Sequence, residues 1–206
     1  NSIVSSRLLS RIAHAHGLEH HTTLTGFKWI ARAPGLGFGY EEAIGFCPDP
    51  AHVRDKDGIA TSVVAASLVA ALKAQGRSVW DELERLARLH GLHVSSPLTF
   101  RVEEIEQIAS GMARLRAQPP SVLAGSPVVE VSDLSQGYRG LPPTDGILVL
   151  TEAGDRVIAR PSGTEPKLKC YLEVILPVAE GEPLPWEQAR ERLDAIKAAF
   201  AEIIGL

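Results

Sequence analysis

The chain has 206 residues, of which 45% are hydrophobic and 22% are charged, and it carries a net charge of −4. This is the composition of a soluble globular protein with one large or two small domains; the acidic balance argues against a nucleic-acid-coating surface, and no apolar run approaches the ~20 residues of a membrane span. The two cysteines, Cys47 and Cys170, lie far apart and favour a reducing cytoplasm over a zinc site or a disulfide framework.

Hydrophobic spacing predicts an α/β arrangement in the first part of the chain. The expected helices are 3–16, 25–33, 58–75, 79–90 and 103–117, and the expected strands are 20–24, 37–41 and 98–102. Thr25 and Ser78 are the expected caps of the second and fourth helices. The third helix is rich in alanine and largely apolar, so we expect it to be buried on most sides.

A linker over 118–121, Gln-Pro-Pro-Ser, separates this part from a second one in which the periodicity changes. There the pattern predicts strands around 128–131, 147–150, 157–158 and 168–176, followed by a closing helix over 186–204. The apolar face of that helix is expected to consist of Ala189, Leu193, Ile196, Phe200 and Ile203. We therefore predict an α/β domain over 1–118 and a small α+β domain over 119–206.

The loop between the last two expected strands has an unusual composition. It contains an arginine, two hydroxyl side chains with a glycine between them, and two prolines, in the order Arg160-Pro161-Ser162-Gly163-Thr164-Glu165-Pro166-Lys167. The arginine fork, the hydroxyls and inward-turned backbone N–H groups are donors that fit phosphate oxygens. The alternative is an ordinary polar turn, since proline, serine and glycine are common turn residues.

Three further polar stretches each leave an alternative open. Glu41 and Glu42 are placed either to accept bonds from vicinal sugar hydroxyls or to be exposed strand-end charges. Asp55 and Asp57 are a candidate divalent-ion pair, but Lys56 between them favours an anion contact. Four histidines, His14, His16, His20 and His21, have no carboxylate or cysteine at ligand spacing, so they favour an exposed segment over a metal site.

Four motifs, in this order and spacing, carry a resemblance that covers essentially the whole chain. They are Thr25-Gly26-Phe27-Lys28, Glu41-Glu42-Ala43-Ile44-Gly45, Arg54-Asp55-Lys56-Asp57-Gly58 and the loop from Arg160 to Pro166. Together they resemble the α-D-phosphohexomutase superfamily of phosphoglucomutases and phosphomannomutases. The resemblance implies the third and fourth of that family's domains: a three-layer mixed-sheet α/β domain, then a small α+β domain like the TATA-binding protein.

The resemblance also implies the roles of individual residues. Glu41 falls on the sugar-hydroxyl ligand, and Lys28 and Lys56 fall near basic positions of the sugar-binding domain. The loop that grips the non-reacting phosphate corresponds to Arg160, Ser162, Gly163 and Thr164, with Lys169 as a second basic contact. Ala43 departs from relatives that have serine there. With Ile44 and Gly45 it resembles the branch that includes phosphopentomutases and glucose-bisphosphate-related mutases, which leaves the preferred sugar open.

Two motifs that the family's chemistry needs do not occur in these residues: the phosphoserine loop and the magnesium-binding Asp-Gly-Asp loop. The resemblance therefore implies the C-terminal half of a cytoplasmic phosphosugar mutase, inactive alone. Its partners are a phosphosugar and the N-terminal half of the same enzyme, which binds Mg²⁺ and responds to a glucose 1,6-bisphosphate-type activator. The alternative from another class is a non-catalytic phosphosugar-binding module. Neither a membrane nor a nucleic acid is an expected partner.

Overall fold

The computed structural model describes residues 1–163 and 165–205, which fold into two compact units. The first unit contains Asn1–Leu92 and Pro177–Leu184, and the second contains His93–Leu176 and Pro185–Leu206. This division falls at residues 92 and 93, whereas the sequence pattern places a boundary near 118–120. The reason is that the helix before the linker packs on the closing helix and on the last strand, which both belong to the second unit.

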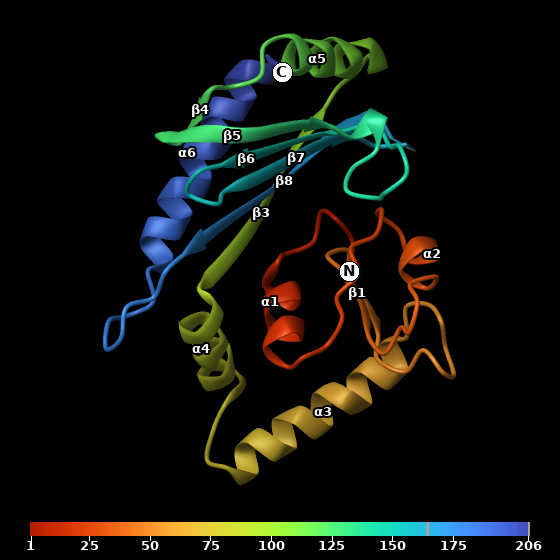
Figure 1. Cartoon of the computed structure of the whole chain (residues 1–206), viewed down its shortest axis with the longest axis vertical. Helices are drawn as coiled ribbons and strands as arrows, with labels where there is room; N and C mark the ends of the chain where they lie inside the picture. Colours follow the sequence, from red (N-terminus) through yellow and green to blue (C-terminus); the bar gives the residue numbers. More distant parts are fainter. Residues whose placement is uncertain (164, 206) are drawn as a thin grey trace. The chain divides into compact units, whose positions relative to one another are not determined.

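The first unit contains four helices and a small sheet within the described residues (Figure 1). The helices are α1 (Leu8–Ala15), α2 (Phe27–Ile30), α3 (Gly58–Ala74) and α4 (Val79–His90); strands β1 (Gly39–Glu41) and β2 (Gly45–Cys47) pair antiparallel. A single parallel bridge joins Ser2 to Thr23. That bridge is all that forms of the expected 20–24 strand. The expected first helix over 3–16 also begins later, at Leu8, because the backbone N–H of Ile3 donates to the Thr23 carbonyl.

Two local expectations for this unit are wrong. The second helix begins after Gly26, whose φ of 110° only glycine adopts easily, and no side chain caps it, so Thr25 is not its cap. Helix α3 is exposed along most of its length, and Leu72 is its one buried residue. Ile59 and Val63 are 85% and 63% exposed. Apolar composition alone therefore did not predict burial, which needs a partner surface.

Capping residues begin α3 and α4. The Asp57 carboxylate accepts a bond from the Ala60 N–H at 2.9 Å, and Asp57 is thus the N-cap of α3. Ser78 begins α4 with a capping box, in which Ser78 and Asp81 satisfy each other's backbone N–H groups. Ser78 was the expected cap, and this prediction is confirmed. Both helices start where the orphan N–H groups of their first turns find an oxygen acceptor.

The second unit is a curled six-stranded sheet in the order β3-β8-β7-β6-β5-β4. The strands are β3 (Leu92–Arg101), β4 (Val122–Leu123), β5 (Ser126–Asp133), β6 (Ile147–Thr151), β7 (Arg156–Pro161) and β8 (Lys167–Leu176), with a 3-10 turn, η1, at Leu134–Gln136. The mixed α/β class expected from the sequence is confirmed.

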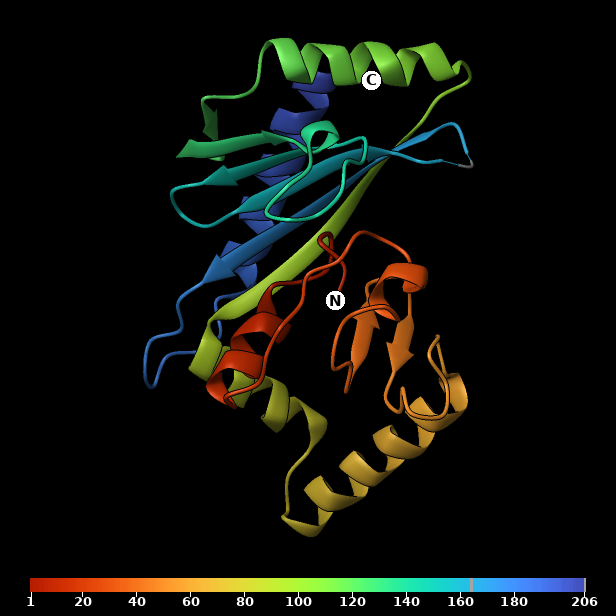
Figure 2. The ribbon, with the colours of Figure 1, turned by 45° about the vertical axis from the view of Figure 1, so that its right-hand side comes forward.

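Two helices complete this unit, α5 (Ile105–Ala117) and α6 (Trp186–Ile204). Helix α6 crosses one face of the sheet (Figures 1 and 2), and α5 packs against α6. The buried residues of α6 are Ala189, Leu193, Ile196, Phe200 and Ile204. Four of them were expected, and Ile204 takes the place that the pattern assigned to Ile203. On β8, every second residue from Leu168 to Leu176 is buried toward this core.

No single helix in the described part of the chain is both long enough and apolar enough to cross a membrane. Helices α3 and α4 meet the length and composition test only as a pair, and they are bent by 90° at their junction.

A buried ion pair holds α6 to the turn between β6 and β7. The Asp155 side chain is 0% exposed, and its Oδ2 accepts from Arg192 Nε at 2.8 Å. The Asp155 backbone N–H donates to Thr151 Oγ1 at 3.0 Å. Because a buried carboxylate is costly without its cation, Arg192 is expected to contribute strongly to the stability of the second unit.

We predict that Arg192→Met lowers the free energy of unfolding by about 3 kcal/mol, since it leaves the buried Asp155 carboxylate without its cation. Lys197→Met is the matched control on the same helix, because Lys197 pairs with an exposed Asp194 and should cost no more than ~0.5 kcal/mol. Urea unfolding followed by circular dichroism measures both. Equal midpoints for the two variants would show that the Asp155 pair is not stabilising.

We also predict that neither cysteine reacts quickly with a thiol reagent in the folded protein. Burial raises the pKa of Cys170 to about 12. Burial also raises the pKa of Cys47, whose Sγ donates to the Val53 carbonyl at 3.2 Å. Both side chains are therefore neutral thiols at mildly alkaline pH and are poor nucleophiles. Ellman's reagent should label both only in concentrated guanidinium chloride; rapid labelling of the native chain would contradict this.

Candidate functional site

Glu41 and Lys56 form an ion pair at the end of β1. Lys56 Nζ lies 2.5 Å from Glu41 Oε1, and it also donates to the Ala43 carbonyl at 3.1 Å. The Glu41 side chain is 6% exposed and that of Lys56 is 43% exposed. The two predicted residues, distant in sequence, are thus brought together, and Lys56 holds both the glutamate and the loop that follows it.

Gly45 is required for this arrangement. A Cβ atom at Gly45 would lie 2.7 Å from Glu41 Cγ, 2.9 Å from Lys56 Cε and 3.0 Å from Phe27 Cε2. Strands β1 and β2 pair Glu41 directly with Gly45, so the missing side chain leaves the space that the ion pair occupies. Phe27 itself belongs to a small buried cluster with Ile30 and Cys47.

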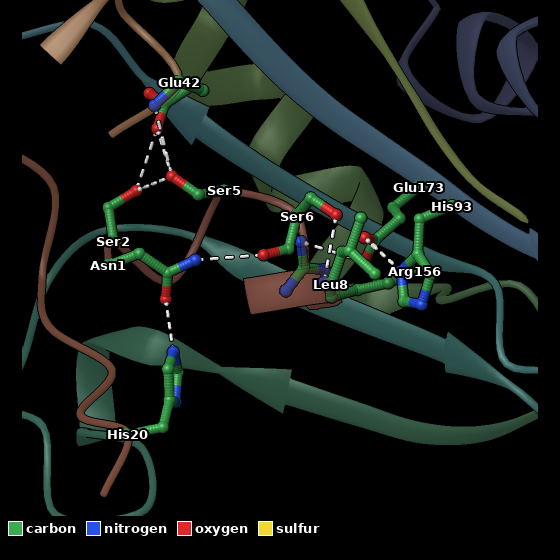
Figure 3. Close-up of polar contacts among 10 residues, drawn as sticks. All are labelled: Asn1, Ser2, Ser5, Ser6, Leu8, His20, Glu42, His93, Arg156 and Glu173. Carbon is green, nitrogen blue, oxygen red and sulfur yellow. Dashed lines mark hydrogen bonds and ion pairs between the residues drawn. The ribbon is translucent and has the colours of Figure 1, made fainter. Parts of the chain in front are cut away.

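The two neighbouring glutamates have different surroundings (Figure 3). Glu42 Oε2 accepts bonds from the hydroxyls of Ser2 at 2.9 Å and Ser5 at 2.8 Å. The Glu42 backbone N–H donates to Ser5 Oγ at 3.2 Å. Glu42 therefore ties its loop to the N-terminal segment, and its carboxylate has partners within the chain. The expected sugar-binding role of the two glutamates stays a prediction. The sequence carried no signal that would link two serines to a glutamate some forty residues away.

The aspartates beside Lys56 have structural partners. Asp57 caps α3, and Asp55 Oδ1 accepts the backbone N–H of Lys56 at 2.7 Å. No group of three or more His, Cys, Asp or Glu side chains in 1–163 and 165–205 is arranged to hold a metal ion. These described residues do not fit a magnesium site.

The histidines and Lys28 lie apart from the Glu41 loop. His20 Nε2 bonds to Asn1 Oδ1 at 2.9 Å, and burial lowers the His20 pKa to about 4, so this ring is neutral near pH 7 (Figure 3). His14 Nδ1 bonds to the Ser10 carbonyl at 2.7 Å. Lys28 is exposed on α2 with Nζ 5.9 Å from the centre of the Trp29 ring. The described residues give Lys28 no ion pair, and no contact joins it to Glu41 or Lys56.

The β7–β8 hairpin places cations opposite each other. Its register pairs Arg160 with Lys169, and the same face pairs Arg156 with Glu173 four residues earlier on β7. Arg156 and Glu173 form an ion pair at 3.4 Å, and His93 Nδ1 lies 3.2 Å from Glu173 (Figure 3). Within the described part of the chain, no carboxylate pairs with Arg160 or Lys169. Like charges directly opposite are unfavourable, so this end of the hairpin is suited to an anion.

The loop beyond these cations is held by its backbone. The Ser162 N–H donates to the Lys167 carbonyl at 2.8 Å, which continues the hairpin by one more pair. Gly163 is exposed, and Thr164 lies outside the described residues. Beside Arg160, Gly146 has no side chain, and a Cβ there would lie 3.4 Å from Arg160 Cβ. The neighbouring strand position thus leaves room next to the arginine.

Two basic residues near this loop were not among the expected site residues. Lys167 Nζ contacts Glu165 Oε1 at 2.7 Å, and alternation along β8 places Lys167 on the face that carries Lys169. Arg101 ends β3, next to Val102, whose N–H donates to the Pro166 carbonyl at 3.1 Å. Arg101 precedes the loop by about sixty residues, so no local sequence pattern indicated it. Lys167 ends the loop in sequence and was interpreted as a charge beside the site.

The hairpin contributes cationic side chains with hydrogen-bond donors to this arrangement. Arg160, Lys167 and Lys169 share one hairpin face, which we call the cationic face, beside a loop with exposed backbone. Such a face is suited to an anion with several oxygens. In the first unit, Glu41 offers a carboxylate already oriented by a lysine.

Two models of one protein family match this chain. Residues 1–89 match "Phosphoglucomutase/phosphomannomutase, alpha/beta/alpha domain III", and residues 99–184 match "Phosphoglucomutase/phosphomannomutase, C-terminal domain". The first match ends at residue 89 and the second begins at residue 99, and the division between the compact units at residues 92 and 93 lies between them.

Curated relatives agree with these models. A protein of Haemophilus influenzae described as "Probable phosphomannomutase" is 42% identical over 84% of this chain and 35% of its own length. A Mus musculus phosphopentomutase is 30% identical over 98% and 36%, and a Staphylococcus aureus phosphoglucomutase is 32% identical over 85% and 35%. The chain thus spans about a third of the length of these relatives.

One solved structure is similar in fold. It is the open form of the exocytosis-sensitive phosphoprotein parafusin, a phosphoglucomutase from Paramecium, with a TM-score of 0.69 and 18% identity. The match covers 100% of this chain and 38% of that chain. At this identity the likeness supports the fold alone.

We predict that Gly45→Ala destabilises the first unit by about 1–3 kcal/mol, because the added methyl overlaps the buried Glu41 and Phe27 side chains. Gly58→Ala is the control, since a Cβ at Gly58 meets nothing within 4 Å and alanine favours the helix that begins there. Thermal unfolding measures both variants. A Gly45→Ala protein as stable as Gly58→Ala would mean that the Glu41–Lys56 pair does not need the space at Gly45.

Proposed function

The chain belongs to the phosphoglucomutase/phosphomannomutase family, and from this premise we propose that it supplies the sugar- and phosphate-binding part of a phosphosugar mutase. The observation that carries the proposal is the hairpin register that sets Arg160 opposite Lys169 with no carboxylate partner in the described residues. An enzyme that moves a phosphoryl group between two positions of a sugar must hold the idle phosphate during the transfer.

The cationic face is proposed to hold that idle phosphate. Arg160 presents a planar fork to two phosphate oxygens, and Lys169 adds a point charge from the facing strand. Ser162 and Gly163 contribute a hydroxyl and backbone near the turn, and Thr164, which lies outside the described residues, belongs to the same loop in sequence. These groups contact the phosphate and do not contact the sugar ring. The ring can therefore bind in either orientation.

Glu41 is proposed to bind sugar hydroxyls, with Lys56 as its positioning residue. The ion pair at 2.5 Å fixes the orientation of the carboxylate, and an ionised carboxylate accepts bonds from two vicinal hydroxyls. Lys28 is also proposed as a substrate contact; it is exposed on α2 and lies over the Trp29 ring.

The chemical steps are proposed to belong to residues outside this chain. In the intact enzyme a phosphoserine gives its phosphoryl group to a sugar hydroxyl: the serine O–P bond breaks and a new P–O bond forms on the sugar. The resulting bisphosphate returns its other phosphoryl group to the serine. A bisphosphate of this kind, such as glucose 1,6-bisphosphate, also serves as the activator. Mg²⁺ would be held elsewhere in that enzyme, and this chain alone is proposed to be inactive.

Two sugars are proposed as the preferred substrate, a hexose phosphate and a pentose phosphate. Hexose phosphate is favoured by the more similar phosphomannomutase and phosphoglucomutase relatives. Pentose phosphate is favoured by Ala43 and by the phosphopentomutase relatives, which align with 98% of the chain. Titration with glucose 1-phosphate and ribose 1-phosphate under the same conditions separates the two. A cytoplasmic location is part of the same proposal, because both cysteines are free and buried.

We predict that Arg160→Ala weakens binding of glucose 1-phosphate by about 10- to 100-fold, because a hydrogen bond to a charged group contributes about 1.5–3 kcal/mol. Lys169→Ala should weaken binding by a smaller factor of about 10. Isothermal titration calorimetry of the 206-residue chain is the measurement. Arg190→Ala, which removes an exposed cation from α6, is the control and should bind like the wild type.

Equal heats from the wild type and Arg160→Ala would rule out the phosphate role of the hairpin. If Arg190→Ala weakened binding as much as Arg160→Ala, the effect would be one of net charge and the site assignment would fail.

A further inference from the structure

Glu165 is an acidic residue of the loop that is proposed to hold the phosphate. It lies in the hairpin loop, and its Oε1 contacts Lys167 Nζ at 2.7 Å. The Lys167 backbone N–H also donates to the Glu165 carbonyl at 2.7 Å, so the two residues are joined twice within one tight turn. The proposed function does not assign a role to this acidic side chain in the middle of an anion-binding loop.

The two partners of this ion pair differ in exposure. The Lys167 side chain is 14% exposed and that of Glu165 is 49% exposed. The lysine is therefore fixed in the hairpin, while the carboxylate has open solvent on one side. If the pair separates, the glutamate is the partner that can rotate away, and it leaves a lysine that is already ordered.

The field around Glu165 comes from the same cations that face the proposed phosphate. The hydrogen bond from Lys167 lowers the pKa of Glu165 most, and the charges of Lys167, Lys169 and Arg101 lower it further. A carboxylate and a phosphate attracted by the same lysines compete for them. The loop thus carries its own anion next to the position where a substrate anion would bind.

We propose that Glu165 is an internal counter-ion of the cationic face: it pairs with Lys167 in the ligand-free loop and releases that lysine to a bound phosphate. The inference rests on the proposed function and deepens it, because it says how Lys167 becomes available to the phosphate and makes Glu165 a determinant of affinity. In the empty site the counter-ion reduces repulsion among the cations. On binding, a phosphate monoester, with more charge and more oxygens, displaces it.

The first test is the affinity of the 206-residue chain for inorganic phosphate and for glucose 1-phosphate, measured by calorimetry. Glu165→Gln keeps the shape of the side chain and removes the charge, and it should tighten binding of both ligands by about 3- to 10-fold at low salt, with a smaller gain at high salt. Glu152→Gln is the matched control: it removes the same charge from the exposed turn at the other end of β7 and should leave affinity unchanged. Unchanged or weaker binding by Glu165→Gln would overturn the counter-ion role.

A second measurement follows the carboxylate itself. Titration of the Glu165 side-chain carbon by NMR should give a pKa below the ordinary glutamate range in the free chain and a higher pKa with saturating inorganic phosphate, because the released carboxylate then lies near an added anion. Lys167→Met should raise the Glu165 pKa in the free chain and abolish the gain from Glu165→Gln. A Glu165 pKa that stays low with phosphate bound would show that the pair persists, and would overturn the proposal.

The Arg160→Ala variant separates this inference from the function on which it rests. If Arg160→Ala loses phosphate binding while Glu165→Gln binds no better than wild type, the phosphate loop stands and the counter-ion role is wrong. If Arg160→Ala binds as well as wild type, the phosphate loop is wrong and the counter-ion role falls with it.

Discussion

The antiparallel register of β7 and β8 is the constraint on which the second unit and its proposed site depend. It sends alternate residues to opposite faces, so Leu168, Cys170 and Leu172 enter the core under α6 while the residues between them form a polar face. On that face Arg156 meets Glu173, and Arg160 meets Lys169. The first pairing is neutralised and stabilises the sheet. The second pairing is not, so the same register that builds the core also concentrates positive charge at one end of the hairpin.

A comparable dependence holds in the first unit, where one lysine organises the Glu41 loop. Lys56 contacts the Glu41 carboxylate and the Ala43 carbonyl, and the absence of a side chain at Gly45 makes room for it. The next residue, Glu42, turns to Ser2 and Ser5 and fastens the loop from the other side. Two adjacent glutamates therefore have different roles: Glu42 positions the loop, and Glu41 is oriented within it as the proposed ligand contact.

Local sequence patterns predicted the elements whose causes are local. The Ser78 capping box, the apolar stripe of α6 and the turn-rich hairpin between β7 and β8 each depend on residues within a few positions of one another. The pattern was least informative where burial or pairing involves distant residues. Helix α3 is apolar yet exposed, and the expected strand over 20–24 is reduced to one bridge, because an apolar segment is buried only if another element covers it.

The amino-acid sequence specifies which groups are present: a loop with an arginine, hydroxyls and glycine, a glutamate after a short strand, and the order of motifs that matches the family. Which of these groups meet depends on the folded structure. It separated Glu41 from Glu42, joined Glu41 to Lys56, brought Arg101 near the loop through the Val102–Pro166 bond, and paired Glu165 with Lys167. Each side chain is specified by its own position in the sequence. Charge compensation instead depends on strand register and on packing between residues that are far apart in the sequence.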